Sequence, residues 1–132
     1  MATMQAEVVS AEQQVFSGEA SEVYARSLEG EIGILPGHQP ALLALDIAPV
    51  RIKLEDGSWV SFAVHRGFLY FRENRLAVLA DIAERAEEID RARAERDLEA
   101  LRAETDGTEE EQAARRDAIR RAELRLDMTE RQ

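Results

Sequence analysis

Four charged residues in the last third of the sequence have types and spacings that suit ligand binding. Asp90 and Arg93 stand three positions apart, so on a helix they share one face. An Asp carboxylate can accept a hydrogen bond from an amino group, and an Arg guanidinium can pair with phosphate oxygens. Arg121 and Arg125, four positions apart, also share a face. The alternative is an ordinary intrahelical ion pair between Asp90 and Arg93, which stabilises a helix by only a few tenths of a kcal/mol.

A second candidate site is the segment Pro36-Gly37-His38-Gln39-Pro40. It cannot form regular structure, because two prolines and a glycine interrupt both helices and strands. A loop fixed in this way has little conformational entropy left to lose when a partner docks. The sequence therefore indicates a contact loop, and the alternative is a simple tight turn with an exposed imidazole. The candidate contact residues of this loop are Pro36, Gly37, His38 and Pro40.

The elements that must position these residues change near Asp81. Before it lie all the aromatic residues and all three prolines, and after it the only glycine is Gly107. Short apolar runs separated by turn signals, such as Asp56-Gly57, predict strands in the first part. Ala, Glu and Arg dominate the second part and predict helices. We expect an α+β protein in two parts, with an antiparallel β-sandwich domain at residues 1–83 and a C-terminal antiparallel α-helical hairpin at 84–132.

The expected boundaries follow from local signals. Strands are predicted at 5–10, 20–26, 32–35, 42–45, 50–54, 59–64, 68–71 and 76–80, with a turn at 17–19. Helices are predicted from Glu84 to Glu104 and from Glu109 to Glu130. Between them, Gly107 supplies a positive φ for the helix exit, and Thr108 with Glu111 has the spacing of a capping box.

The apolar faces of the two helices consist mostly of alanine. One runs through Ala94, Leu98 and Leu101, and two adjacent stripes on the second helix are Ala114, Ala118, Ala122 and Ile119, Ala122, Leu126. Such faces bury little area, at roughly 25 cal/mol per Å². The small buried area indicates a weakly held hairpin that could detach and refold. The residues alone nevertheless favour the alternative, a fixed hairpin with a solvated exterior.

Composition excludes several classes of function. The net charge of −10 argues against binding to nucleic acid or to anionic lipid. The absence of Cys excludes disulfides and thiolate chemistry, and His occurs only at 38 and 65, so no metal site is expected. No apolar run approaches the roughly 20 residues that span a bilayer, and the N-terminus lacks a secretory signal. The protein is expected in the cytoplasm, with any membrane association made through a partner protein.

No segment has the pattern of a catalytic centre. The sequence lacks a P-loop, a nucleophile elbow and an H-E-x-x-H motif. We therefore expect no catalytic residue, no enzymatic activity and no required cofactor.

Three stretches resemble the epsilon subunit of F-type, bacterial-type ATP synthases. They are Val8 to Gly18 (VVSAEQQVFSG), Gly30 to Pro40 (GEIGILPGHQP) and Leu76 to Asp81 (LAVLAD), the last followed by Ala83 and the run IDRARA at 89–94. Their order and spacing also match, so the resemblance covers essentially the whole chain. It implies a sandwich of about ten strands followed by a helical hairpin, and a non-catalytic subunit of the central stalk.

The resemblance also implies partners. In this family the sandwich binds the gamma subunit and the ring of c subunits, and helps to couple proton-driven rotation to ATP synthesis. The loop containing His38 faces these rotor partners, with Glu31 near the c ring and His38 near gamma. The tail can fold on the sandwich, or extend toward the alpha and beta subunits and hinder ATP hydrolysis. The complex would hold this chain peripherally at the cytoplasmic face of the cell membrane.

The run at 89–94 matches the I/L-D-x-x-R-A motif with which some members of the family bind regulatory ATP. Arg121 and Arg125 align with further phosphate-facing positions. The implied ATP-binding residues are Ile89, Asp90, Arg93, Ala94, Arg121 and Arg125. One position departs from the pattern, since binding members have another Arg where this chain has Ala100.

Two other functions remain open on the residues alone. One is a free-standing small-molecule sensor whose tail closes over a nucleotide. This hypothesis would be favoured if the chain failed to co-purify with the gamma subunit. The other is a small hydrolase using Asp and Glu of the sandwich, which would require turnover by the isolated chain.

Overall fold

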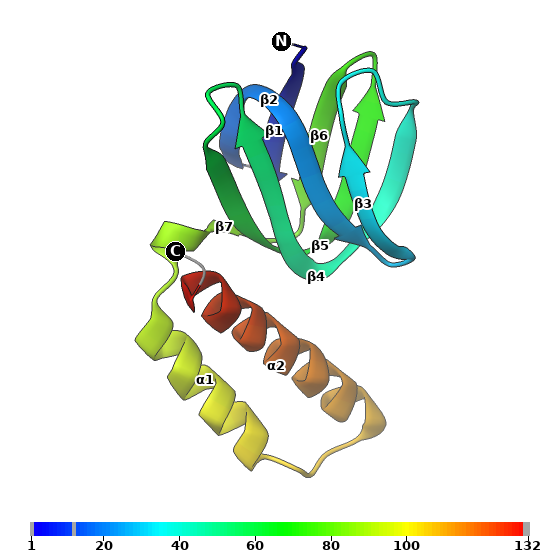
Figure 1. Cartoon of the computed structure of the whole chain (residues 1–132). Helices are drawn as coiled ribbons and strands as arrows, with labels where there is room; N and C mark the ends of the chain where they lie inside the picture. The colour runs from blue at the N-terminus through cyan, green and yellow to red at the C-terminus, as the bar shows by residue number, and fades with distance from the viewer. Residues whose placement is uncertain (1, 12, 131–132) are drawn as a thin grey trace. The chain divides into compact units, whose positions relative to one another are not determined.

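The computed structural model describes residues 2–11 and 13–130 and divides the chain into two units, 1–85 and 86–132. The division falls two residues after the expected one. Figure 1 shows a first unit built of strands and a second built of helices. The strands are β1 (Met4–Ser10), β2 (Gln13–Ser27), β3 (Gly30–Ile34), β4 (Ala41–Leu54), β5 (Trp59–Arg72), β6 (Arg75–Ala80) and β7 (Ala83–Arg85). A 3-10 turn, η1 (Ala86–Glu88), precedes α1 (Arg91–Ala103) and α2 (Glu109–Glu130).

The strands close into a barrel-like sandwich. Their order is β1-β6-β5-β4-β2-β3, and β1 also pairs with β2, while β7 pairs with β5. The pairing of β1 with β6 is parallel, and the other pairings in the described part of the chain are antiparallel. The expectation of a sandwich is confirmed, with that one parallel pair as a correction.

Three long strands, β2, β4 and β5, each contribute residues to both layers of the sandwich. The second half of β2 pairs with β3, and its first half pairs with β1. The first half of β5 pairs with β7 and its second half with β6, while β4 follows β5 along its length. One layer therefore contains β3 and β7, and the other contains β1 and β6. The described residues form seven strands where the resemblance implies about ten, because each bent strand continues through a position expected to separate two.

The bend in β5 occurs at a glycine that no other residue could replace without movement of the backbone. The ladder of β4 and β5 is interrupted there without a change of register, between the pair of Leu45 with Gly67 and the pair of Ile47 with His65. Gly67 has a φ of 136°, and a Cβ on it would lie 2.2 Å from the backbone oxygen of Leu79. The predicted turn at 17–19 is wrong, because Ser17 and Gly18 pair in register with Glu7 and Ala6 and the strand continues through them.

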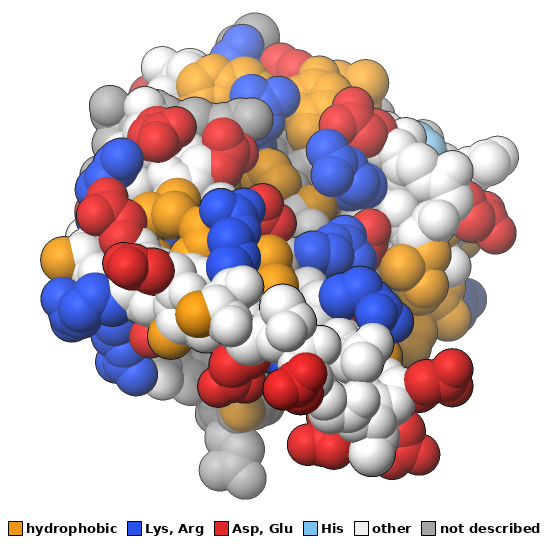
Figure 2. All heavy atoms as spheres, turned by 90° about the horizontal axis from the view of Figure 1, so that it is seen from below, with side chains coloured by type: hydrophobic (Ala, Val, Ile, Leu, Met, Phe, Trp, Pro, Cys, Tyr) orange, Lys and Arg blue, Asp and Glu red, His pale blue; other side chains and the backbone are white. Residues whose placement is uncertain are grey.

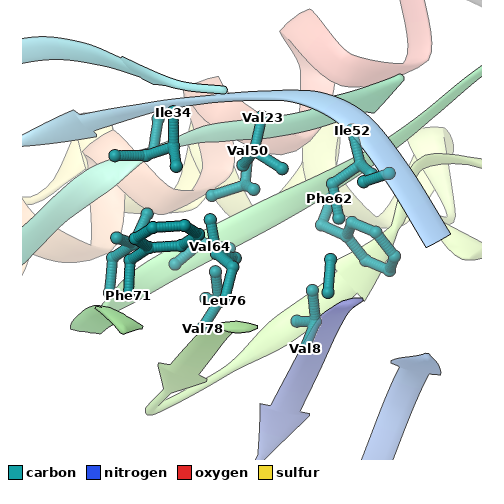
Figure 3. Close-up of a cluster of buried hydrophobic side chains, with 14 of the residues drawn as sticks. Val8, Val23, Ile34, Val50, Ile52, Phe62, Val64, Phe71, Leu76 and Val78 are labelled. Carbon is teal, nitrogen blue, oxygen red and sulfur yellow. The ribbon is translucent and has the colours of Figure 1, made fainter. Parts of the chain in front are cut away.

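Between the layers lies one apolar core. Figure 3 shows side chains from β1, β2, β3, β4, β5 and β6 pointing toward one another. Phe62, Val64 and Val78 are fully buried, and Phe71 and Leu76 nearly so. The alternation of buried and exposed residues along β6 is the period of a strand with one face in a core. This core fixes the positions of the loops and outer faces described below.

The first helix begins later than predicted. Glu84 and Arg85 belong to β7, whose residues pair with Phe62, Ala63 and Val64, so ladder hydrogen bonds override their helix propensity. The bounds of the second helix, Glu109–Glu130, are as predicted. Its capping box is confirmed: the Thr108 amide donates to Glu111 Oε1, and the Glu111 amide donates to Thr108 Oγ1, each at 3.1 Å.

The helices bury few side chains. They are Ala94 and Leu98 on α1, and Ala122, Leu124 and Met128 on α2. Gly107 has the predicted positive φ, but α1 ends at Ala103, so the glycine lies beside the cap of α2 and not at the exit of α1. Ala114 is exposed, contrary to its predicted place on an apolar stripe. Acidic and basic side chains are interspersed on the face of the molecule in Figure 2. Of the helices described, neither is long and apolar enough to cross a bilayer.

Candidate contact loop and tail motif

The segment after β3 forms a tight turn whose shape follows from its sequence. The His38 amide donates to the Leu35 carbonyl at 3.0 Å, which closes a four-residue turn over Pro36 and Gly37. Gly37 has a φ of 84°. This is the pattern of a type II turn, in which proline suits the second position and glycine the third. Pro36, Gly37 and His38 therefore share one rigid loop, while Pro40 lies exposed just before β4.

Asn74, in the hairpin turn between β5 and β6, holds this loop through hydrogen bonds. Its Oδ1 accepts from the Gly37 amide at 2.9 Å, and its Nδ2 donates to the Thr3 carbonyl at 2.8 Å. Its φ of 63° lies in the left-handed region, which Asn adopts more readily than most residues. The sequence does not predict this role, because Asn74 and Gly37 are 37 positions apart and only the fold brings them together.

His38 is half-buried and oriented by its neighbours. Its Nδ1 lies 2.7 Å from the carbonyl oxygen of Gln39, so that nitrogen carries the proton and donates. Its ring meets the Phe71 ring edge-on, with centroids 5.9 Å apart. Glu31 lies on β3, where its Oε1 is 3.4 Å from Nη2 of Arg26 on the neighbouring strand, and both side chains are largely exposed. The loop thus presents polar groups on a backbone anchored at both ends.

Beside the loop, the layer that contains β1 and β6 has an apolar outer face. The face consists of Leu42 on β4, Phe68 and Tyr70 on β5, and Leu79 on β6, whose side chains are 66%, 53%, 42% and 48% exposed. The register joins them, since Leu42 pairs with Tyr70 and Phe68 pairs with Leu79. A groove of about 460 Å³ continues the face over Tyr70 and Ala77 toward Arg72 and Arg75. A contiguous exposed apolar face of this kind marks an interaction site.

In the second unit, the motif at 89–94 forms the start of α1. Asp90 is the N-cap: its Oδ1 accepts from the Arg93 backbone amide at 3.1 Å. The alternative of an ion pair between the Asp90 and Arg93 side chains is wrong, because the Arg93 guanidinium turns toward Asp97, with Nε 4.0 Å from Oδ2. Ile89 lies between η1 and the cap, with its amide donating to the Ala86 carbonyl, and Ala94 is buried.

The four charged residues of the candidate ATP site lie at different positions along the axis of the hairpin. They are Asp90, Arg93, Arg121 and Arg125. Ion pairs fix the register of the helices, with Arg91 level with Glu130 and Arg102 level with Glu123. Asp90 and Arg93 therefore lie at the open end of the hairpin. Arg125 lies between the two levels. Arg121 lies beyond the second and is nine residues from Glu130 at the open end, roughly 13 Å along the helix at 1.5 Å per residue.

Comparison with known proteins agrees with this architecture. Residues 3–86 match the family described as "ATP synthase, Delta/Epsilon chain, beta-sandwich domain". The ATP synthase epsilon chain of Streptomyces avermitilis is 50% identical over 125 residues, which is 95% of this chain and 94% of that protein. The epsilon chain of Herpetosiphon aurantiacus is 42% identical over 127 residues, covering 95% of this chain and 93% of that one.

Solved structures share the fold at low sequence identity. A chain of the Euglena gracilis mitochondrial ATP synthase (OSCP/F1/c-ring) superposes with a TM-score of 0.84 at 20% identity, covering 94% of this chain and 79% of that one. A chain of the Tetrahymena thermophila mitochondrial ATP synthase (central stalk/c-ring) gives 0.64 at 15%, covering 96% of each. These matches define a class of small ATP synthase subunits with a β-sandwich. The chain belongs to the ATP synthase epsilon-chain family, whose members are non-catalytic subunits of the complex.

Proposed function

We propose that this chain couples rotation of the c ring to ATP synthesis as a component of the central stalk, with its sandwich bound to the gamma subunit. The observation that carries the proposal is the apolar outer face of Leu42, Phe68, Tyr70 and Leu79. Burying a Phe or Leu side chain contributes roughly 1.5–3 kcal/mol, so four such residues form an adequate centre for a stable interface. The fold relatives belong to ATP synthase assemblies, one described as OSCP/F1/c-ring and the other as central stalk/c-ring, and this supports the proposal.

The rigid loop and Glu31 form the second contact in this proposal, with the c ring. The loop is held by its own turn and by Asn74, so docking costs it little entropy. The His38 ring contacts the ring of Phe71 on β5. The residue before Phe71 on that strand, Tyr70, belongs to the apolar outer face. In the complex the subunit would be peripheral, at the cytoplasmic face of the cell membrane.

Binding to purified gamma subunit tests the proposal. Replacing Leu42 and Phe68 together by Ser is expected to weaken the dissociation constant at least tenfold, about 1.4 kcal/mol or more. Trp59→Ser is the matched control, because Trp59 is 46% exposed on the other layer and should leave gamma binding unchanged. Equal affinity of the double variant and the wild type would refute this interface.

The tail motif supports a second proposal, that regulatory ATP binds the hairpin in its folded state and opposes an extended, inhibitory state. Asp90 and Arg93 lie at the N-terminus of α1, where free backbone amides and the helix dipole favour anionic groups. Arg93 is 75% exposed and can reach a phosphate. Ala100, where binding members of the family have Arg, would weaken the affinity.

Calorimetric titration of the full chain with ATP tests this second proposal. Arg93→Gln and Asp90→Ser are both expected to abolish binding. Asp90→Ser is the informative variant, because Ser is also a good N-cap and preserves the helix while removing the carboxylate. Absence of heat at millimolar ATP, or full binding by Asp90→Ser, would exclude the site and leave the stalk function untouched.

A further inference from the structure

The other layer of the sandwich carries a cluster of aromatic and basic side chains on its outer face. The cluster consists of Tyr24 on β2, Arg51 and Lys53 on β4, and Trp59 on β5. In register, Arg51 pairs with Tyr24, and Lys53 pairs with Trp59. Cζ of Arg51 lies 5.8 Å from the centroid of the Tyr24 ring and 5.3 Å from that of Trp59, and Lys53 Nζ lies 5.9 Å from Trp59. These are cation–π distances, so the rings and cations form one stack.

Gly33 on β3 leaves the space that the Tyr24 ring occupies. The two residues pair in register, and a Cβ at position 33 would lie 2.8 Å from Cε1 of Tyr24. At the far end of the ring, the Tyr24 hydroxyl donates to Glu22 Oε1 at 2.5 Å. This hydrogen bond raises the pKa of Tyr24 and lowers the pKa of Glu22. The ring is fixed at both ends and has little freedom left to lose when a partner docks.

Of the two cations in the cluster, Lys53 has a carboxylate as its ion-pair partner, whereas Arg51 has none among the described residues. Glu22 is already engaged by the Tyr24 hydroxyl and by Lys53, whose Nζ is 3.3 Å from Glu22 Oε2. Within residues 2–11 and 13–130, the Arg51 side chain stacks on two rings but forms no ion pair or hydrogen bond. Arg51 and Trp59 are both exposed. In a chain of net charge −10, a stacked cation with its donors directed to solvent complements an acidic surface.

We propose that this face is a second docking surface, for an acidic segment of a partner protein whose carboxylate pairs with Arg51 beside the rings of Tyr24 and Trp59. Trp, Tyr and Arg are the residues that most often dominate the binding energy of interfaces. A guanidinium stacked on aromatic rings still presents its N–H edge, which matches a carboxylate in bidentate geometry. This surface lies on the other layer from the apolar face, so the inference does not depend on the proposed binding of gamma.

The single Trp of the chain lies in the cluster, so its fluorescence reports on the proposed site directly. The full chain is titrated at low salt with a short, end-blocked peptide of glutamate residues. The peptide is expected to shift the Trp59 emission saturably, whereas a glutamine peptide of the same length is not. Arg51→Gln is expected to weaken the glutamate peptide roughly tenfold, as loss of one charge-assisted pair implies. Gly33→Ala, which displaces the Tyr24 ring, should weaken it as well.

Arg26→Gln is the matched control. Arg26 lies on the same strand as Tyr24 and already pairs with Glu31, so its removal should leave the affinity for the peptide unchanged. No saturable shift, or equal affinity of wild type and Arg51→Gln, would overturn the proposal. So would an equal shift with inorganic phosphate at the same ionic strength, because that result would define a site for small anions and not for an acidic segment.

Discussion

The sandwich and the helical hairpin of this chain are held by different kinds of contact. In the sandwich, large apolar side chains from six strands meet in one core, with Phe62 and Val64 fully buried. In the hairpin the buried residues are few and include two alanines, Ala94 and Ala122. Exposed ion pairs such as Arg102 with Glu123 also join the helices, and they contribute only about 0–1 kcal/mol each.

The difference would allow one small subunit to combine the proposed docking surface on the sandwich with the proposed change of conformation in the tail. Apolar burial contributes roughly 25 cal/mol per Å², and it is lost only when the whole core opens. Screened ion pairs between helices can be exchanged for pairs elsewhere at small cost in free energy. The contact loop and both outer faces belong to the sandwich, whereas the candidate ATP motif belongs to the hairpin.

The largest expected effect comes from removing the centre of the core. Phe62→Ala should cost about 3–5 kcal/mol of the free energy of unfolding, because it leaves a cavity between both layers. Denaturant unfolding monitored by Trp59 fluorescence measures this loss. If the variant unfolds with the stability of the wild type, the core is not what holds the sandwich.

A smaller and local effect is expected in the hairpin. Leu98→Ala should cost about 2–3 kcal/mol, near the lower end for a buried Leu, and only the helical signal should report it. Far-UV circular dichroism should show earlier loss of helix on heating, while the Trp59 transition stays at the wild-type temperature. A shift of both transitions together would mean that the two units unfold as one, and would contradict a separate stability of the hairpin.

The sequence predicts the elements that depend on local pattern. The bounds of α2 and its capping box follow from Thr108 and Glu111, and β1 and β6 follow from alternation and turns. It does not predict β7, because only pairing with Phe62 to Val64 converts a helix-favouring segment into a strand. The hydrogen bond of Asn74 to Gly37 and the contact of Arg51 with Tyr24 are not predicted for the same reason, since each joins residues far apart in the sequence.

The next effect concerns how the sandwich holds its contact loop. Asn74→Gly keeps a residue that tolerates the φ of 63° but removes the hydrogen bonds to Gly37 and Thr3. We expect a loss of about 1–2 kcal/mol and faster hydrogen exchange at the Gly37 amide. Glu73→Gly in the same turn is the control, because the Glu73 side chain makes only a long, exposed contact with Arg72, 3.8 Å between Nε and Oε1. Equal exchange rates in the two variants would show that Asn74 does not anchor the loop.

The smallest effect concerns the hairpin and pH. The backbone amide and the hydroxyl of Thr108 lower the pKa of Glu111 below its ordinary value of 4.5. A carboxyl whose pKa is depressed by folding adds stability above its unfolded pKa, and this stability is lost as the pH falls through the folded pKa. The helical content of α2 should therefore decrease below about pH 4.5, and less so in Glu111→Gln, which cannot titrate there. Since the other acidic residues titrate in both proteins, the difference between the two circular dichroism profiles isolates the cap, and identical profiles would show that the cap contributes nothing to the tail.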